Sequence, residues 1–175
     1  MKITLLTSPR TAGTYYGIKL AEHHNVPYLG EIFNQDISQQ PIVDQVLNME
    51  AGVCKVHADM NAFILNMLLQ KSDEVYFLIR KDIDAQVKSI LCARHRNPKD
   101  PWDPRSYDRT DNTGETININ VKQSEYNHYK DKITVSNSIV KKYSEAFNST
   151  VKYTEDIILE DNRPYGQQYN LIIGD

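Results

Sequence analysis

The stretch ITLLTSPRTAGTY at residues 3–15 indicates the fold of the whole chain. Residues 3–7 are apolar and β-branched, and the run stops before Pro9, which is typical of a buried central strand. A helix is predicted to follow at residues 13–24. Residues 7–15 therefore form a loop between the carboxyl end of a strand and the start of a helix.

The composition of this loop predicts an anion-binding site. Gly13 and the small Ala12 let backbone N–H groups approach an anion closely, and the helix that starts there adds its positive dipole end. Thr11 and Thr14 can donate hydroxyl hydrogen bonds, and Arg10 can make a bidentate contact with phosphate or sulfate. The patterns GxxxxGK[ST] and GxGxxG are both absent from the chain, which argues against an ordinary ATPase, GTPase or dinucleotide-binding loop.

The rest of the chain alternates between strand-like and helix-like segments. Strands are predicted at residues 26–33, 52–57, 74–79 and 150–153, and helices at residues 41–49, 60–69, 82–93, 122–147 and 155–159. This alternation predicts an α/β fold of three layers, α/β/α, with a central, mostly parallel sheet. In such a sheet the ligand lies at the carboxyl ends of the strands.

We treat residues 1–175 as a single domain. Residues 97–115 would be a mobile loop or a lid over an acceptor, and residues 160–175 receive no assignment. Two helices should have recognisable buried faces. These faces are expected to carry Ile18, Leu20 and Ala21 on the first helix, and Tyr126, Tyr129, Ile133, Val140, Tyr143 and Phe147 on the longest.

Charge, hydropathy and cysteine content argue against several classes of protein. The net charge of -3 and the pI near 5.9 are not those of a non-specific nucleic-acid binder. No run approaches the roughly 18 apolar residues of a membrane span, and the N-terminus does not resemble a signal peptide. Cys54 and Cys92 have no CxxC partner and are expected to be small buried residues in a reducing, cytoplasmic setting. The oligomeric state stays open.

Polar side chains at two further strand ends could join the loop. Lys55 and His57 are two residues apart in an extended segment, so they point the same way, and a histidine can act as a general base near neutral pH. Glu31 ends the segment at residues 26–33 and could be a second base or could hold a substrate hydroxyl. Each of these residues could also be an ordinary surface residue.

A third group of polar residues follows the strand at residues 74–79. Arg80 and Lys81 come directly after it, and Ser89 lies two helical turns further along. Two cations at a strand end face the same edge of a parallel sheet as the first loop, so they could hold a second anion.

In this order, the motifs SPRxxGT, GEIF, KxH, LIRKDxxAQxxS and VKYTEDI resemble the sulfotransferases that use 3′-phosphoadenosine 5′-phosphosulfate (PAPS). The stretch from Arg80 to Ser89 is closest to the bacterial branch that includes trehalose sulfotransferases, whose pattern there is RRDxxAQxxS. Glu31 is similar to a glutamate of that branch that is a proposed base. Lys55-x-His57 resembles the cytosolic and heparan-type enzymes, in which the histidine is the base. The matches cover residues 3–159.

The resemblance implies an enzyme that moves a sulfuryl group from PAPS, leaving PAP, to a hydroxyl or amine of a small molecule or carbohydrate, without a metal. It implies that the 5′-phosphosulfate loop consists of Arg10, Thr11, Ala12, Gly13, Thr14 and Tyr15. It implies that the 3′-phosphate is bound by Arg80, Lys81 and Ser89. His57 or Glu31 would be the base, with Lys55 and Arg10 stabilising the transferred group. The glycine of the loop lies one position later than in the family's usual loop.

Two other functions are also considered. One is a nucleotide-binding protein of the same fold that lacks turnover. The other is a small-molecule kinase of the P-loop type, against which the missing GK[ST] counts heavily.

Overall fold

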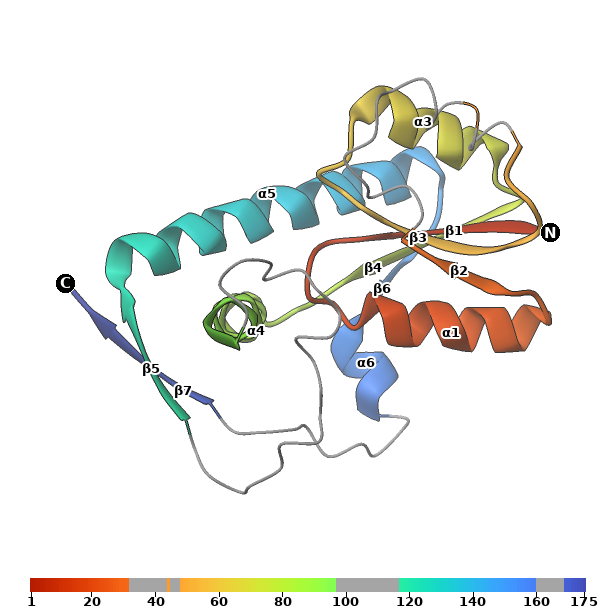
Figure 1. Ribbon diagram of the computed structural model, residues 1–175. Coiled ribbons are helices and arrows are strands. Elements are labelled where there is room, and N and C mark those ends of the chain that lie inside the picture. Colours follow the sequence, from red (N-terminus) through yellow and green to blue (C-terminus); the bar gives the residue numbers. More distant parts are fainter. Residues whose placement is uncertain (32–43, 45–47, 97–116, 160–168) are drawn as a thin grey trace. The chain divides into compact units, whose positions relative to one another are not determined.

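The computed structural model describes residues 1–31, 44, 48–96, 117–159 and 169–175 (Figure 1). The predicted loop or lid at residues 97–115 lies outside the described residues, as do residues 41–43 and 45–47 of the predicted helix at residues 41–49. The chain divides into two compact units, one formed by Met1–Lys81 and Val135–Ile157 and the other by Asp82–Thr134 and Ile158–Asp175.

Among the described residues, five parallel strands form the sheet of the first unit, in the order β2-β3-β1-β4-β6. They are β1 (Lys2–Thr7), β2 (Tyr28–Gly30), β3 (Gly52–His57), β4 (Glu74–Ile79) and β6 (Val151–Tyr153). The strands predicted at residues 52–57 and 74–79 are confirmed with the same bounds. β1 is central, because Thr7 pairs with His57 of β3 on one side and with Leu78 of β4 on the other.

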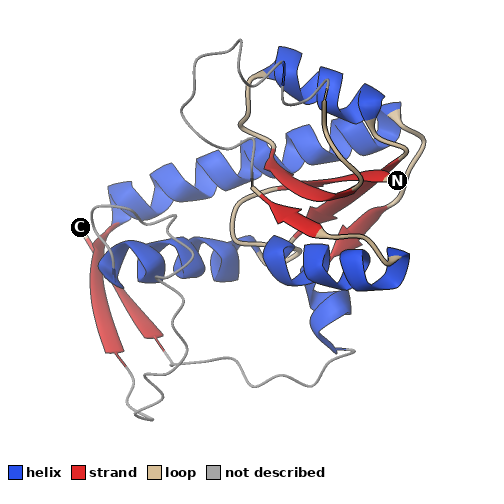
Figure 2. Cartoon of the chain, turned by 45° about the vertical axis from the view of Figure 1, so that its right-hand side comes forward, coloured by secondary structure: helices blue, strands red, loops and turns tan. Residues whose placement is uncertain are grey.

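Helices cover both faces of this sheet, which confirms the predicted three-layer α/β/α fold (Figures 1 and 2). One face packs against α1 (Gly13–His24) and α6 (Thr154–Leu159). The other packs against α3 (Ala62–Lys71) and against residues 135–146 of α5 (Gln123–Ala146). Side chains alternate between the two faces with a period of two residues, so that Leu5 lies on the α1 side and Leu6 on the α3 side.

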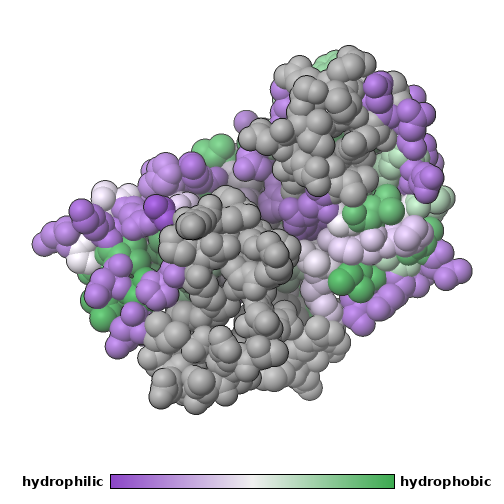
Figure 3. Space-filling model, viewed as in Figure 1, coloured by the Kyte–Doolittle hydropathy of each residue, from purple (hydrophilic) through white to green (hydrophobic). Residues whose placement is uncertain are grey.

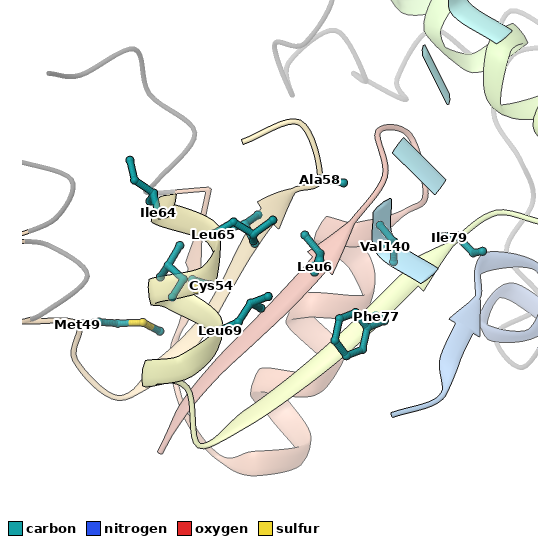
Figure 4. Close-up of a cluster of buried hydrophobic side chains, with 12 residues drawn as sticks. Leu6, Met49, Cys54, Ala58, Ile64, Leu65, Leu69, Phe77, Ile79 and Val140 are labelled. Carbon is teal, nitrogen blue, oxygen red and sulfur yellow. The ribbon is translucent and has the colours of Figure 1, made fainter. Parts of the chain in front are cut away.

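The larger core of the first unit lies between the sheet and α3 (Figure 4). Leu6, Val56 and Phe77 from three neighbouring strands are fully buried there, and Leu65 and Leu69 of α3 pack onto them. On the face drawn in Figure 3 the described surface is mainly hydrophilic, with separate hydrophobic patches. The apolar side chains are thus largely collected into the core, as a stable sheet-helix layer requires.

Two details of the helices differ from the prediction. The helix predicted at residues 60–69 begins at Ala62, because Asn61 caps it by accepting a hydrogen bond of 2.9 Å from the backbone N–H of Phe63. On α1, Ile18 is 40% exposed, so its assignment to the buried face was wrong, although Leu20 and Ala21 are buried. The buried face instead passes through Gly17, where an added Cβ would lie 2.5 Å from the ring of Tyr28.

The second unit contains two strands that sequence reasoning missed. β5 (Ile117–Lys122) and β7 (Tyr169–Gly174) pair in parallel along their whole length, and α4 (Ile83–Arg96) and residues 123–134 of α5 belong to the same unit. Ile119 and Val121 of β5 are buried with Ile133 of α5. The alternation of apolar and polar residues in ININVK is the signal that would have identified β5.

The long helix predicted at residues 122–147 is confirmed as α5. Of the predicted stripe, Ile133 and Val140 are buried, and Tyr126, Tyr129 and Tyr143 are partly buried against the cores. Phe147 is 39% exposed and lies just beyond the helix. No helix in the described part of the chain is both long and apolar enough to cross a bilayer.

The buried core gives a direct test of this packing. Replacing the fully buried Phe77 with alanine should lower the free energy of unfolding by about 3–5 kcal/mol, because the ring leaves a cavity between the sheet and its helices. The matched control is Phe63→Ala, since Phe63 is 68% exposed, and it should change stability by less than about 0.5 kcal/mol. Urea unfolding followed by circular dichroism measures both. Equal losses for the two variants would contradict the core described above.

Candidate functional site

The loop after β1 has an unusual backbone. Arg10 has a φ of 62° and Ala12 a φ of 54°, so two non-glycine residues adopt the left-handed conformation. Each such residue costs on the order of 1–3 kcal/mol, and strain of this kind collects at binding sites. Left-handed residues at alternate positions turn successive N–H groups into one concavity that suits an anion. Ala12 is the N-cap of α1 and has no side-chain oxygen to cap the first turn.

Threonine hydroxyls hold this loop against its neighbours. The buried Thr11 donates through Oγ1 to the carbonyl oxygen of Ser8 at 2.9 Å. Thr154, at the start of α6, contacts the carbonyl oxygens of Thr11 at 2.8 Å and of Ile79 at 3.2 Å through its own hydroxyl. The hydroxyl of Thr11 is therefore used for a hydrogen bond within the loop, and the hydroxyl of Thr154 connects the loop to the end of β4. Sequence reasoning assigned no role to Thr154, although it lies in the motif VKYTEDI directly after a predicted strand.

Gly13 lies where the side chains of Lys55 and Thr7 pass close to the start of α1. Gly13 is buried in the first turn of α1, and an added Cβ would lie 2.9 Å from Cδ of Lys55 and 3.0 Å from Cγ2 of Thr7. The glycine is needed for the close passage of the Lys55 side chain, whereas the left-handed conformation falls on Ala12.

Lys55, His57 and Glu31 meet beside the loop. Lys55 and His57 alternate with buried residues along β3, and both make ion-pair contacts with the carboxylate of Glu31, at Oε1 for Lys55 and at Oε2 for His57, the latter 3.4 Å from Nε2. Lys55 Nζ also donates to Oγ1 of Thr14 at 3.1 Å, which joins this group to α1. The Lys55 side chain is only 8% exposed, so its charge lies in a poorly solvated position.

The surroundings of Glu31 keep it ionised. Burial by itself raises the pKa of this carboxyl group, but the hydrogen bond from His57 and the positive charge of Lys55 outweigh burial and hold the pKa well below its usual value. A carboxylate with so low a pKa is a weak proton acceptor. It is well suited to hold an imidazole ring and an ammonium group in place.

The cations after β4 contact carboxylates of α6. Arg80 Nε lies 3.5 Å from Oε1 of Glu155, and Lys81 Nζ lies 2.7 Å from Oδ1 of Asp156. Ser89 lies on α4, which belongs to the second unit. The expectation that these three residues bind a second phosphate therefore stays a prediction.

Of the other residues assigned to the loop, Arg10 precedes α1, whereas Thr14 and Tyr15 lie in its first turn. Arg10 and Tyr15 are half-buried, and the exposed Thr14 contacts Lys55. The Tyr15 ring lies 5.8 Å from the ammonium nitrogen of Lys19. Over the described part of the chain, no group of His, Cys, Asp and Glu residues has the arrangement of a metal site.

Comparison of the chain with models of protein families, with curated proteins and with solved structures found no match.

The lowered pKa of Glu31 predicts a pH-dependent stability. A carboxyl group whose pKa is lower in the folded protein contributes stability above its unfolded pKa, here near 4.5, and this contribution is lost as the pH falls towards the folded value. Between about pH 6 and about pH 3, the urea midpoint should therefore fall more for the unmodified protein than for Glu31→Gln. The control Glu145→Gln removes an exposed carboxylate of α5 and should keep the original pH dependence. Parallel curves for Glu31→Gln and the unmodified protein would show that the contacts with Lys55 and His57 do not stabilise the fold.

Proposed function

We propose that this protein transfers a sulfuryl group from PAPS to a hydroxyl or amine of a small molecule or carbohydrate. The proposal rests on one observation: Lys55 and His57 both contact the carboxylate of Glu31, and they do so beside a strained loop at the start of α1. A cation, an imidazole and a concave row of N–H groups are the parts that transfer of an anionic group needs.

The loop supplies the binding of the 5′-phosphosulfate. The backbone N–H groups at residues 10–14 and the positive end of the α1 dipole favour a phosphate or sulfate group. Arg10 adds a guanidinium group that can contact two oxygens at once. Lys55 is held against the same loop through Thr14, so its ammonium group is within reach of an anion bound there.

The chemistry is an in-line displacement at sulfur. The acceptor hydroxyl loses its proton to His57 while its oxygen forms a bond to sulfur. The bond between sulfur and the bridging oxygen breaks, and its electron pair leaves on the 5′-phosphate of PAP. Arg10, Lys55 and the loop N–H groups stabilise the charge that develops on the bridging oxygen, and such preorganised donors are usually the largest catalytic contribution. No metal is needed for these steps.

The geometry favours His57 over Glu31 as the base. Glu31 contacts two cationic or polar partners and has a strongly lowered pKa, so it accepts a proton poorly. Its carboxylate instead fixes the ring of His57, as the acidic member of a catalytic dyad does. Glu31 is thus a positioning residue in this mechanism.

The proposal includes a reducing, cytoplasmic setting. Cys54 and Cys92 are both buried and neither forms a disulfide, and burial raises the pKa of Cys54 to about 11. A thiol in this state is protonated and unreactive, which fits a structural role for Cys54.

Nucleotide binding tests the first half of the proposal. In isothermal titration the unmodified protein should bind PAP, and Arg10→Ala should weaken binding by about 10- to 100-fold through the loss of a charge-assisted contact. Lys71→Ala, which removes an exposed cation from the last turn of α3, should leave PAP affinity unchanged. Tight binding of ATP or GTP without binding of PAP would contradict the proposed function and favour the alternative of a P-loop small-molecule kinase.

Transfer of labelled sulfate from PAPS tests the second half. His57→Ala should lower the rate by about 10²- to 10⁴-fold, the usual contribution of a general base. His23→Ala, an exposed histidine of α1, is the matched control and should keep the full rate. If Glu31→Ala abolishes transfer while His57→Ala does not, the base is Glu31. If the protein binds PAP but transfers nothing to a broad acceptor panel, it is a nucleotide-binding protein without turnover.

A further inference from the structure

The carboxyl end of β4 is occupied by side chains of α6. Glu155 contacts two donors there, because its Oε1 lies 3.5 Å from Arg80 Nε and its Oε2 accepts the backbone N–H of Lys81 at 3.0 Å. Asp156 accepts from the Lys81 ammonium group at 2.7 Å. Arg80, Lys81, Glu155 and Asp156 of the first unit therefore form one connected group of contacts, which we call the β4–α6 clasp.

The clasp is held in place by its surroundings. The Thr154 hydroxyl contacts the carbonyl oxygens of both Ile79 and Thr11, so the start of α6 is fixed to β4 and to the loop. Lys81 Nζ lies 4.8 Å from the centre of the Tyr153 ring, a favourable cation–π distance. Glu155 and Asp156 are thus presented to the two cations by a fixed piece of backbone.

The clasp lies at the sheet edge where the loop lies. β1 and β4 are neighbours, and Thr7, just before the loop, pairs with Leu78, just before Ile79 and Arg80. Consider a ligand with two anionic groups. If the loop binds the first group, the second group would lie towards the end of β4. The donors it would meet are the Arg80 guanidinium, the Lys81 N–H and the Lys81 ammonium group.

Glu155 and Asp156 already accept hydrogen bonds from the Lys81 N–H and from the Lys81 ammonium group, and Glu155 Oε1 lies 3.5 Å from Arg80 Nε as an ion-pair partner. The two cations and two carboxylates have a net charge of zero, so the clasp offers an incoming phosphate little net attraction. A phosphate has two ways to bind here. It can displace the carboxylates, which compete strongly because they belong to the same chain and so have a high effective concentration, or it can bind beside their two negative charges. The carboxylate of Glu155 thus takes the place that a phosphate of the ligand would otherwise occupy.

We propose that Glu155 and Asp156 determine nucleotide specificity by making a second phosphate on the ligand contribute little to binding. The inference rests on the proposed function and deepens it, because it names the class of donor: nucleotides anchored through a 5′-phosphosulfate, with or without a 3′-phosphate. PAPS and adenosine 5′-phosphosulfate should then both serve as sulfuryl donors.

The test compares PAP with AMP, which lacks the 3′-phosphate, by isothermal titration at one salt concentration. The unmodified protein should bind the two nucleotides with affinities within about tenfold of each other. In Glu155→Gln/Asp156→Asn, which keeps the shapes and removes the charges, the preference for PAP should rise by at least about tenfold. Glu145→Gln, which removes an exposed carboxylate of α5, should leave the ratio unchanged.

A preference of the unmodified protein for PAP above about 100-fold would overturn the inference and leave the proposed function standing. An unchanged ratio in the double variant would overturn it as well. If the double variant does not fold, Asp156→Asn replaces it, because the Asp156 side chain is 58% exposed. Failure of both PAP and AMP to bind, with no transfer from either donor, would instead refute the proposed function, and the inference with it.

Discussion

The parallel pairing of β1 with β3 on one side and with β4 on the other is the constraint on which the first unit depends. Because Thr7 is in register with His57 and with Leu78, three strands end at the same level. The loop, the Lys55–His57 pair and the β4–α6 clasp all follow from that alignment. The apolar side chains of the same three strands form both cores, so the interaction that stabilises the fold also assembles the site.

Three cations of the candidate site form ion pairs with carboxylates. Lys55 contacts Glu31, Arg80 contacts Glu155, and Lys81 contacts Asp156. Pairing matters most for Lys55, whose side chain is only 8% exposed, because an unpaired charge in so poorly solvated a position would be costly. Under the proposed function, an anionic ligand would have to bind beside Glu31 and Glu155 or exchange with them. The strained backbone at Arg10 and Ala12 is the part of the site that does not depend on charge pairs.

The fold was largely predictable because its signals are local. The strand candidates at residues 52–57 and 74–79 match β3 and β4 to the residue, the second through its apolar run VYFLI, and the strand–loop–helix junction identified β1 and α1. Two errors have physical causes. In β5, polar residues alternate with apolar ones, so it has no continuous apolar run, and its partner β7 lies about 50 residues further along the chain, a pairing that no local pattern reports. Ile18 was misplaced because the face of α1 that approaches the sheet is lined by glycines, which have no hydropathy signal of their own.

By itself, the sequence determined the loop's chemistry and the shared direction of Lys55 and His57, because composition and the period of a strand are properties of neighbouring residues. Only the tertiary structure decided which groups these residues meet. Glu31 lies more than twenty residues from Lys55 in the chain, and Glu155 lies 75 residues from Arg80, so their contacts depend on strand order and on the path of α6. The same holds for Gly13, whose place in the loop is explained only by the Lys55 side chain that passes against it.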